Sequence, residues 1–312
     1  MTDTHTTTPP DLPTLFKALA DITRVRLMAV LIRHELRVGE LVQVMDMGQS
    51  RISRHLRILS DCGLVSSRRD GLWAYYSAAK GSFPFLSAVK PFFEESDPLW
   101  AKDLANASQV LKDRENAVRS FFQDKAGDWD RLRLDILGTL DLEAEIIARM
   151  RSCPTAADLG CGAGHLLPAL LSKADRVVGV DSSSSMLEEA LKRLRDKGER
   201  VSLRLGTLEH LPLSDREADF ALCSMVLHHL SDPREGLSDA WRVLASGGTL
   251  VLVELDKHDR ESMRQEYGDQ WLGFQGQELA EWLQRAGFEL SDHARYTVEH
   301  NLGVHIMTAR KQ

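Results

Sequence analysis

The chain has 312 residues, of which 43% are hydrophobic and 27% are charged, and its formal net charge is −7. This length is enough for two domains that each bury a core of their own. The acidic balance argues against nucleic-acid binding by the whole molecule. No apolar run approaches the ~20 residues of a membrane span, which predicts no membrane partner.

The first ten residues are rich in Thr and Pro and lack the basic-then-apolar pattern of a signal peptide, so we expect a disordered tail over residues 1–10. Four cysteines, at positions 62, 153, 161 and 223, form neither a C-x-x-C pair nor a metal-ligand spacing. This pattern favours reduced thiols and no metal site. Together these features predict a cytoplasmic protein.

Charge is unevenly distributed along the chain. Residues 1–95 hold 12 Lys and Arg against 10 Asp and Glu, a balance of +2, whereas the remainder holds 27 against 36, a balance of −9. The basic excess is concentrated in residues 49–71. A local basic cluster on an acidic protein is a candidate nucleic-acid footprint.

Apolar residues recur at helical spacing in four segments of the N-terminal third. The predicted helices cover residues 15–20, 22–32, 38–45 and about 50–60. Asp21 is placed to cap the second helix. In the fourth helix Ile52, Leu56 and Leu59 share one face and should pack inward. A tight turn at 47–49 joins the third and fourth helices, which is typical of a helix-turn-helix.

After the fourth helix the pattern alternates with period two. Residues 64–68 and 72–76 are predicted strands, and Asp70-Gly71 between them is a strong hairpin signal. The hairpin would form a wing beside the fourth helix, with Arg68 and Arg69 near its tip. Helix-turn-helix and hairpin together predict a winged-helix DNA reader.

Polar side chains on the outer sides of the fourth helix and near the wing tip are the candidate DNA contacts. They are Gln49, Ser50, Arg51, Ser53, Arg54, Arg57, Arg68 and Arg69. The alternative is that the arginines form a solvated face without a nucleic-acid partner. His55 is equally compatible with a core position and a DNA contact. The aromatic residues of the hairpin are expected to be core rather than base-stacking groups; they are Trp73, Tyr75 and Tyr76.

This third of the chain resembles the ArsR/SmtB family of winged-helix regulators. The matching stretches are F-K-A-L-A-D at 16–21 with Thr23-Arg24, S-R-I-S-R-H-L-R-I-L at 50–59, Gly63-Leu64-Val65 and Tyr75-Tyr76. The resemblance implies a homodimer that places two Arg-rich helices in successive major grooves of a double-stranded DNA operator. Metal-sensing members carry Cys-Val-Cys on the third helix. Here Arg37 and Gly39 stand where thiolates would be needed, and neither binds a soft metal.

Residues 80–150 look largely helical, with prolines at 84, 91 and 98. A long helix over 99–122 could join two domains and extend a dimer interface. The stretch 127–130 would end it, and one or two helices would follow over 132–150. We therefore expect a winged helix-turn-helix domain at 11–82, a helical linker and dimerisation segment at 83–125, and a second domain at 126–312.

A glycine-rich loop, D-L-G-C-G-A-G-H at 158–165, follows an apolar approach and precedes a helical run at 166–171. Glycine can take positive φ, so a ligand can lie against bare backbone. The following helix would point its free N–H groups and positive dipole end at that ligand. Asp181 ends a second apolar strand about twenty residues further on, where an acid can accept hydrogen bonds from both ribose hydroxyls.

The loop reads G-x-G-x-G with Asp158 before it, not the G-x-G-x-x-G that seats a pyrophosphate. An acid at the loop entrance repels phosphate but suits a ligand with an ammonium group, such as S-adenosylmethionine (SAM). The block resembles motif I of the Rossmann-like SAM-dependent methyltransferases. The other interpretation is a structural glycine turn in a different α/β domain.

The resemblance implies a binding site for SAM or S-adenosylhomocysteine and no metal ion. The cofactor-binding residues that it implies are Asp158, Gly160, Cys161, Gly162, Gly164, Asp181, Ser182, Met186, Thr207, Leu208 and Ser224. The methyltransferase pattern has Asp where this chain has Thr207, so its hydroxyl or the Glu209 carboxylate would have to meet the adenine amino group. Residues 121–130 are similar to the lead-in helix that often covers the SAM pocket.

Strands and helices alternate after the glycine loop, which is typical of a parallel sheet with its ligand at the carboxyl ends of the strands. Further strands are expected at 201–205, 218–225, 247–254, 288–290 and 304–308, the last two antiparallel, with a helix opening at 226–230. The predicted fold is α plus α/β: an N-terminal winged helix-turn-helix, a helical linker and a C-terminal Rossmann-like methyltransferase domain with a mostly parallel seven-stranded sheet.

Methyl transfer is an in-line displacement in which positioning supplies much of the rate, so few residues need be catalytic. His229 and His258 are the catalytic candidates, His229 as a base near the sulfonium, with His228 and Glu254 beside them. The alternative is that His228 and His229 merely pack the helix. Three aromatic residues, Tyr267, Trp271 and Phe274, could wall an acceptor pocket or belong to the core.

Fusions of this kind resemble ArsR-type regulators with a methyltransferase-like domain, including those that respond to S-adenosylhomocysteine. The leading hypothesis is a dimeric transcriptional regulator whose C-terminal domain binds SAM or S-adenosylhomocysteine as effector. The alternative is an active methyltransferase on a small-molecule acceptor, with or without autoregulation, or with a winged domain that only dimerises. The sequence leaves open the operator, the direction of regulation, the preferred ligand and the acceptor.

Overall fold

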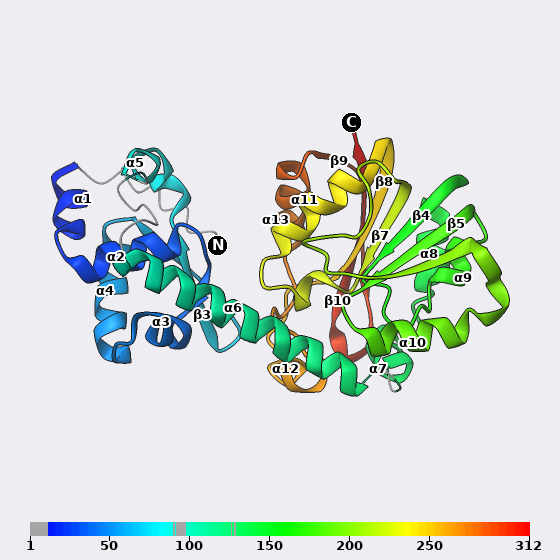
Figure 1. The fold of residues 1–312 in the computed structure, drawn as a ribbon, viewed down its shortest axis with the longest axis horizontal. Helices are drawn as coiled ribbons and strands as arrows, with labels where there is room; N and C mark the ends of the chain where they lie inside the picture. The colour runs from blue at the N-terminus through cyan, green and yellow to red at the C-terminus, as the bar shows by residue number, and fades with distance from the viewer. Residues whose placement is uncertain (1–11, 90, 92–97, 126, 128) are drawn as a thin grey trace. The chain divides into compact units, whose positions relative to one another are not determined.

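The computed structural model describes residues 12–89, 91, 98–125, 127 and 129–312, so the predicted tail over residues 1–10 lies outside the described residues. The chain divides into two compact units, Met1–Arg114 and Glu115–Gln312 (Figure 1). This division falls within the segment predicted as a helical linker, inside one long helix.

The first unit contains short helices and a small sheet. Its helices are α1 (Leu12–Leu19), α2 (Ile22–Leu31), α3 (Val38–Met45), α4 (Gln49–Asp61), the 3₁₀ turn η1 (Lys80–Ser82), α5 (Phe83–Val89) and the first part of α6 (Pro98–Lys125). Its strands are β1 (Leu36–Arg37), β2 (Val65–Asp70) and β3 (Trp73–Ala78), in the order β1-β3-β2. The predicted helix-turn-helix and wing are confirmed.

Local sequence explains where these helices begin and which faces they bury. The carboxylate of Asp21 accepts the backbone N–H groups of Thr23 and Arg24, at 2.9 and 3.3 Å, and so caps α2 as predicted. The apolar stripe of α4 is buried; it consists of Ile52, Leu56 and Leu59. A single core therefore joins α4 to α2, α3 and the hairpin.

The hairpin register differs slightly from the sequence prediction. Asp70 pairs with Trp73, so the two-residue loop is Gly71-Leu72 and not Asp70-Gly71. Gly71 has a φ of +57°, which supplies the left-handed backbone that a tight hairpin needs at its first loop position. Asp70 is consequently drawn into the strand and is buried.

The second unit is an α/β domain. Its helices are the end of α6, α7 (Trp129–Leu137), α8 (Leu142–Arg149), α9 (Leu167–Leu170), α10 (Ser184–Arg193), α11 (Pro233–Val243), α12 (Met263–Glu266) and α13 (Gly276–Arg285), with 3₁₀ turns η4 (Arg195–Arg200), η5 (Leu227–His229) and η6 (Glu299–Asn301). Its strands are β4 (Cys153–Leu159), β5 (Ala174–Asp181), β6 (Val201–Leu205), β7 (Ala218–Ser224), β8 (Leu244–Leu255), β9 (Phe288–Thr297) and β10 (Gly303–Lys311).

These strands form one seven-stranded sheet in the order β6-β5-β4-β7-β8-β10-β9 (Figure 1). Strands β4 to β8 are mutually parallel, which confirms the mostly parallel sheet. The last two strands pair antiparallel, as predicted: β10 is antiparallel to both β8 and β9. As a consequence β9 runs in the same direction as β8.

The strand order reverses between β4 and β7, so the loops that leave their carboxyl ends diverge and open a crevice there. Strand β4 lies at the centre of the sheet and is apolar on both faces, with Ala156, Ala157 and Leu159 fully buried. This buried strand fixes where the glycine loop begins. The crevice is the position at which a doubly wound sheet binds its ligand.

Two predicted helices are much shorter than expected. The run after the glycine loop forms only α9, four residues, because Pro168 opens it and the chain must turn back to β5 at Ala174. The run after β7 forms only the single turn η5 before Pro233 starts α11. The glycine loop is therefore not followed by a long helix whose dipole could act on a ligand.

No helix among the described residues combines the length and apolar character needed to cross a membrane. The longest, α6, is strongly charged along its 28 residues.

Candidate functional site

Helix α4 presents the predicted DNA-contact residues to solvent. Its six candidate side chains are all exposed; they are Gln49, Ser50, Arg51, Ser53, Arg54 and Arg57. The opposite stripe is fully buried. The helix is thus held from one side and leaves three guanidinium groups available to phosphates or base edges.

The two arginines of the wing differ in their surroundings. Arg69 is exposed. Arg68 is half-buried, with its Nε 3.4 Å from the Glu35 carboxylate and its guanidinium 5.7 Å from the centre of the Tyr75 ring. Arg68 is therefore partly engaged within the domain, and Arg69 is the more available of the two.

His55 is a core residue of the first unit. It is 8% exposed, its Nδ1 lies 3.9 Å from Asp21, and burial lowers its pKa. Of the hairpin aromatics, Tyr75 is fully buried, whereas Trp73 and Tyr76 are half-buried. His55 and Tyr75 are therefore core residues, in agreement with the interpretation that placed them in the interior of the domain.

The glycine loop after β4 adopts backbone conformations that other residues avoid. Gly160 has a φ of +87°, and a Cβ there would lie 2.4 Å from a methyl group of Val226. Gly164 has a φ of +74°, and a Cβ there would lie 2.8 Å from the Cβ of Ala190 on α10. Loop shape and close packing against two other segments both require glycine at these positions.

Two carboxylates border this loop, that of the buried Asp158 and that of the half-buried Asp181. Asp181 accepts the backbone N–H groups of Gly162 and Ser183, at 2.8 and 2.9 Å, which orients its side chain. Asp158 is 2% exposed, and burial, reinforced by the charge of Asp181, raises the pKa of Asp158 to about 7. Burial also raises the pKa of Asp181. Two such acids favour a cationic or hydroxyl-rich ligand over a phosphate.

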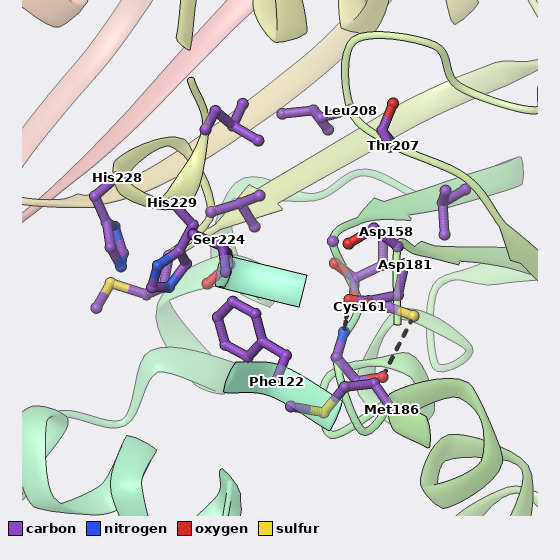
Figure 2. A pocket seen from close by; sticks show the side chains of 18 of the residues that line it. Phe122, Asp158, Cys161, Asp181, Met186, Thr207, Leu208, Ser224, His228 and His229 are labelled. Atoms are coloured by element: carbon purple, nitrogen blue, oxygen red, sulfur yellow. Dashed lines mark hydrogen bonds between the residues drawn. The ribbon is translucent and has the colours of Figure 1, made fainter. Parts of the chain in front are cut away.

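A cavity of about 280 Å³ opens at the carboxyl ends of β4, β5, β6 and β7 (Figure 2). Ten of the eleven predicted cofactor-binding residues line it: Asp158, Gly160, Cys161, Gly162, Asp181, Ser182, Met186, Thr207, Leu208 and Ser224. The eleventh, Gly164, instead packs against α10. Contacts from four strand ends thus converge on one cavity, all within the second unit.

The adenine end predicted around Thr207 also carries a carboxylate. Glu209 lines the cavity, and burial raises its pKa, while a hydrogen bond from Thr207 acts in the opposite direction. Leu208 is buried between them. Thr207 and Glu209 are therefore both available for the role that the methyltransferase pattern gives to Asp.

A second set of polar side chains surrounds His228, which lies away from Asp158 and Asp181 (Figure 2). The Nδ1 of His228 lies 2.7 Å from Glu254, which also accepts the backbone N–H groups of Val226 and Leu227. The Nε2 of His228 lies 3.7 Å from the carboxylate of Asp269. Although burial alone would lower it, these two carboxylates raise the pKa of His228 to about 9.

The two catalytic candidates are placed differently. His229 lines the cavity and its ring meets that of Phe122 edge-on, with the centroids 4.7 Å apart. Burial and the neighbouring His228 lower the pKa of His229. His258 does not line the cavity, and burial lowers its pKa to about 4. The structure brings His229, but not His258, to the predicted ligand.

Of the three aromatic residues considered for the wall of an acceptor pocket, one lines the cavity and two do not. Tyr267 lines the cavity and its hydroxyl group donates to Asp135 at 2.5 Å. Trp271 and Phe274 are fully buried outside the cavity lining, and the Trp271 indole donates to the carbonyl of Leu230. Only Tyr267 can meet an acceptor.

Asp269 lies within the run 267–274 that the sequence offers as a candidate beside the histidines, but the sequence assigned it no role of its own. It is 4% exposed, lines the cavity and faces both His228 and His229. It lies about forty residues after the histidines within an irregular segment, so no spacing could have linked them. A signal did exist in its immediate setting, since a lone acid within an aromatic run is unusual for a core.

All four cysteines are unpaired. Cys161 lines the cavity, but burial and the nearby Asp158 raise the pKa of its thiol well above the usual range. Burial likewise raises the pKa of Cys153 to about 11. Thiols in this state are poor nucleophiles, which does not favour thiol chemistry at the cavity.

Both parts of the chain match models of known families. Residues 21–67 match the model of the bacterial regulatory protein arsR family. Residues 157–252 match the model of a methyltransferase domain, and this match covers the glycine loop, Asp181 and the His228-His229 pair.

Curated relatives each match one part. The uncharacterized methyltransferase YcgJ of Bacillus subtilis is 35% identical over 119 residues, which are 38% of this chain and 46% of that protein. The arsenic resistance transcriptional regulator ArsR1 of Pseudomonas putida is 45% identical over 65 residues, 20% of this chain and 51% of that protein. The chain thus spans about half the length of each relative.

A solved structure shows the same fold in the second unit. It is the 1,6-didemethyltoxoflavin-N1-methyltransferase of Burkholderia thailandensis, crystallised with 1,6-didemethyltoxoflavin and S-adenosylhomocysteine. The TM-score is 0.55 at 22% identity, over 65% of this chain and 90% of that one. The likeness establishes the Rossmann-like architecture.

Proposed function

The chain joins a winged-helix domain of the bacterial arsR regulatory family to a methyltransferase domain, and on this premise we propose that it is a dimeric, DNA-binding transcriptional regulator. Its C-terminal domain binds SAM or S-adenosylhomocysteine as the effector. The observation that carries the proposal is that one chain holds both an exposed basic helix and a cavity lined by two acids, Asp158 and Asp181.

The N-terminal unit supports the DNA-binding part. A helix that is packed along Ile52, Leu56 and Leu59 presents its arginines outward, which is how a recognition helix enters a major groove. Helix α4 of each protomer would read one half-site, so the proposed dimer predicts an operator with two-fold symmetry. The ArsR1 relative, a transcriptional regulator, matches this part of the chain.

The C-terminal unit supports the choice of ligand. Asp158 and Asp181 would meet the ammonium group and the ribose hydroxyls of SAM or its demethylated product, neither of which carries a phosphate. Asp158 is buried and Asp181 is half-buried, and the lowered dielectric constant of such surroundings strengthens these contacts. The Burkholderia thailandensis enzyme, which has the same fold, was crystallised with S-adenosylhomocysteine.

Helix α6 offers a route between ligand and DNA. Its first part belongs to the DNA-binding unit, and its last turns carry Phe122, which lines the cavity. For ligand to change DNA affinity, its own affinity must differ between the DNA-competent and the DNA-incompetent states. A ligand that contacts Phe122 can satisfy this condition.

The test is a titration of DNA from the upstream region of the gene by fluorescence anisotropy, at fixed salt, without ligand, with SAM and with S-adenosylhomocysteine. We expect specific binding that either ligand shifts by about 5- to 150-fold, the usual range of allosteric coupling. A scrambled DNA of the same length is the control. Specific binding that neither ligand alters would contradict the effector role.

The second candidate function is that of an active methyltransferase. The polar side chains around His228 favour this function. A domain that only senses SAM needs the acids near the glycine loop but not Glu254, His228 and Asp269 at the other end of the cavity. Transfer of a labelled methyl group from SAM to a small-molecule extract would support catalysis. Tight SAM binding without turnover on any such pool would count against it.

A further inference from the structure

On the side of the cavity away from Asp158 and Asp181, where Figure 2 shows His228 and His229, three side chains that could bind a metal ion meet. They are His228, His229 and Asp269, and one ligand atom from each lies within 4.8 Å of the others. All three are buried, yet all three line the cavity. An ion could therefore reach them through the same opening that admits the proposed ligand.

The distances are close to those of an occupied metal centre. The Oδ1 atom of Asp269 lies 3.7 Å from Nε2 of His228 and 3.9 Å from Nδ1 of His229. Tetrahedral Zn²⁺ with bonds of about 2.0–2.1 Å separates its ligand atoms by roughly 3.4 Å. The two distances from Asp269 to the histidines are therefore within about half an ångström of that spacing.

Glu254 orients one of the rings as metal sites require. Its carboxylate lies 2.7 Å from Nδ1 of His228, and the backbone N–H groups of Val226 and Leu227 fix that carboxylate. With Nδ1 donating to Glu254, the lone pair of Nε2 points away from Glu254 and can bind an ion. Carboxylate, histidine and metal in this order form a frequent arrangement around protein-bound zinc.

The surroundings of Asp269 supply the strongest argument for a cation at this position. Neither of its carboxylate oxygens has a hydrogen-bond donor among the described residues, although the side chain is almost fully buried. The nearby Arg264 is held by Glu261 at 3.1 Å and by the carbonyl of Gln270. A buried carboxylate without hydrogen bonds is unfavourable, and a divalent ion would satisfy it.

We propose that His228, His229 and Asp269 bind a divalent transition-metal ion of the Zn²⁺ type, with Glu254 as the hydrogen-bonding partner of His228. The contact of His229 Nδ1 with the carbonyl of Gly268, now 3.3 Å, would be exchanged for the metal. In this arrangement His229 is a ligand and not a proton acceptor.

Three protein ligands leave at least one coordination position open, and here it faces the cavity. That position would take an anionic oxygen or a thiolate of a small molecule bound beside SAM. Two imidazoles and a carboxylate suit Zn²⁺, Fe²⁺ or Co²⁺ better than Mg²⁺ or Ca²⁺, which prefer oxygen ligands. The metal site goes beyond the proposed regulatory function, because it requires neither DNA nor SAM.

A second histidine cluster of the same composition serves as an internal comparison. His293, His305 and Asp256 form a hydrogen-bonded chain, with His293 Nε2 3.0 Å from His305 Nδ1 and His305 Nε2 3.1 Å from Asp256. Arg295 also donates to Asp256 at 2.6 Å. The ligand atoms of this cluster are already paired with one another, so it is not expected to bind an ion.

The experiment uses the full chain without an affinity tag, freed of metal with a chelator. Zn²⁺ is titrated by calorimetry, and Co²⁺ is titrated while its visible absorption is recorded, because the intensity of these bands reports the coordination number. Asp269→Asn removes a ligand with almost no change of shape, and Glu254→Gln removes the charge behind His228. His305→Gln is the matched control from the second cluster.

We expect one ion per chain, at least 100-fold weaker binding in Asp269→Asn, a loss of about 10- to 100-fold in Glu254→Gln, and no change in His305→Gln. Zn²⁺ should raise the Tm of the wild type and of His305→Gln but not that of Asp269→Asn. Circular dichroism establishes that each variant is folded. The proposal is overturned if the wild type binds no ion stoichiometrically, or if folded Asp269→Asn binds as well as the wild type.

Discussion

The guanidinium group of Arg114 contacts both oxygens of the buried Glu40 carboxylate. Its Nη2 lies 2.6 Å from each oxygen, and its Nε lies 3.1 Å from Oε1. Arg37 approaches the same carboxylate at 2.7 Å. Glu40 belongs to α3, the helix before the proposed recognition helix, and Arg114 belongs to α6. This ion pair anchors the first part of α6 to the helix-turn-helix.

The first prediction concerns Arg114→Met. It leaves a buried carboxylate with only its Arg37 partner, so we expect a loss of about 3 kcal/mol in the stability of the first unit. Lys112→Met, an exposed cation on the same helix, is the control and should change stability little. Urea unfolding followed by circular dichroism measures both. Equal stability of the two variants would show that the buried pair contributes nothing.

The same ion pair predicts how the stability of the first unit changes as the pH is lowered. Burial tends to raise the pKa of Glu40, but Arg114 and Arg37 together hold it below its usual range. A carboxyl group with a lowered folded pKa stabilises the protein above its unfolded pKa, and that stability is lost as pH falls through the folded value. We therefore expect Arg114→Met to reduce the stability lost on acidification below about pH 5, compared with the wild type.

The second prediction concerns Gly160→Ala. Its φ of +87° and a Cβ only 2.4 Å from Val226 should strain the glycine loop by on the order of 1–3 kcal/mol. We expect SAM binding, measured by calorimetry, to weaken by more than tenfold. Gly39→Ala is the control, because Gly39 lies in helix α3 with nothing near its absent Cβ, and it should be neutral or stabilising. Unchanged SAM affinity in Gly160→Ala would exclude the loop as the binding surface.

The third prediction is a proton released on SAM binding. The pKa of Asp158 is raised to about 7 in the ligand-free protein, and a nearby ammonium group would lower it. Near pH 6.5 we expect binding to release up to about one proton per chain, measured by calorimetry in buffers of different ionisation enthalpy. Asp158→Asn should abolish the release, and Asp215→Asn, an exposed control, should keep it. A release that persists in Asp158→Asn would assign the proton to another group.

The raised pKa of Asp158 also affects stability without ligand. The folded form holds its proton more tightly than the unfolded chain, whose Asp titrates near ~3.9. This contribution is fully present below that value and is lost as pH rises through about 7. Asp158→Asn should therefore stabilise the ligand-free second unit at pH 8 more than at pH 4.

The fourth prediction concerns Arg51→Ala with Arg54→Ala. Both side chains are exposed on α4, and base-specific contacts would be worth about 1–3 kcal/mol each. If they bind phosphates instead, the slope of log affinity against log salt should fall by about 0.9 per contact. The control removes two exposed cations of the second unit, Lys192→Ala with Arg285→Ala, for the same change in net charge. Anisotropy at several salt concentrations distinguishes the outcomes, and equal effects of both pairs would refute the recognition-helix role.

Periodicity and turn chemistry in the sequence were sufficient to predict much of the fold. The third helix and the third strand of the sheet begin and end as predicted, because their apolar residues recur with one clear period. Asp21 caps α2 because the cap depends on residues two and three positions away. The glycine loop could also be predicted, because G-x-G-x-G followed by an acidic residue is a local sequence pattern.

Predictions failed where the surrounding structure overrode a local pattern. The helical runs after the glycine loop and after β7 shrank to single turns, because the chain had to return to the sheet within a few residues. His55 lies among exposed arginines in sequence but is drawn into the core by its contact with α2.

The sequence by itself therefore determined the two kinds of domain, the basic helix and the loop for a phosphate-free nucleoside, since each depends on residues close together in the chain. Only the tertiary structure decided which side chains share the cavity. It excluded His258 and brought Asp269 to His228, about forty residues away, because chain segments from different strand ends converge at the reversal of strand order.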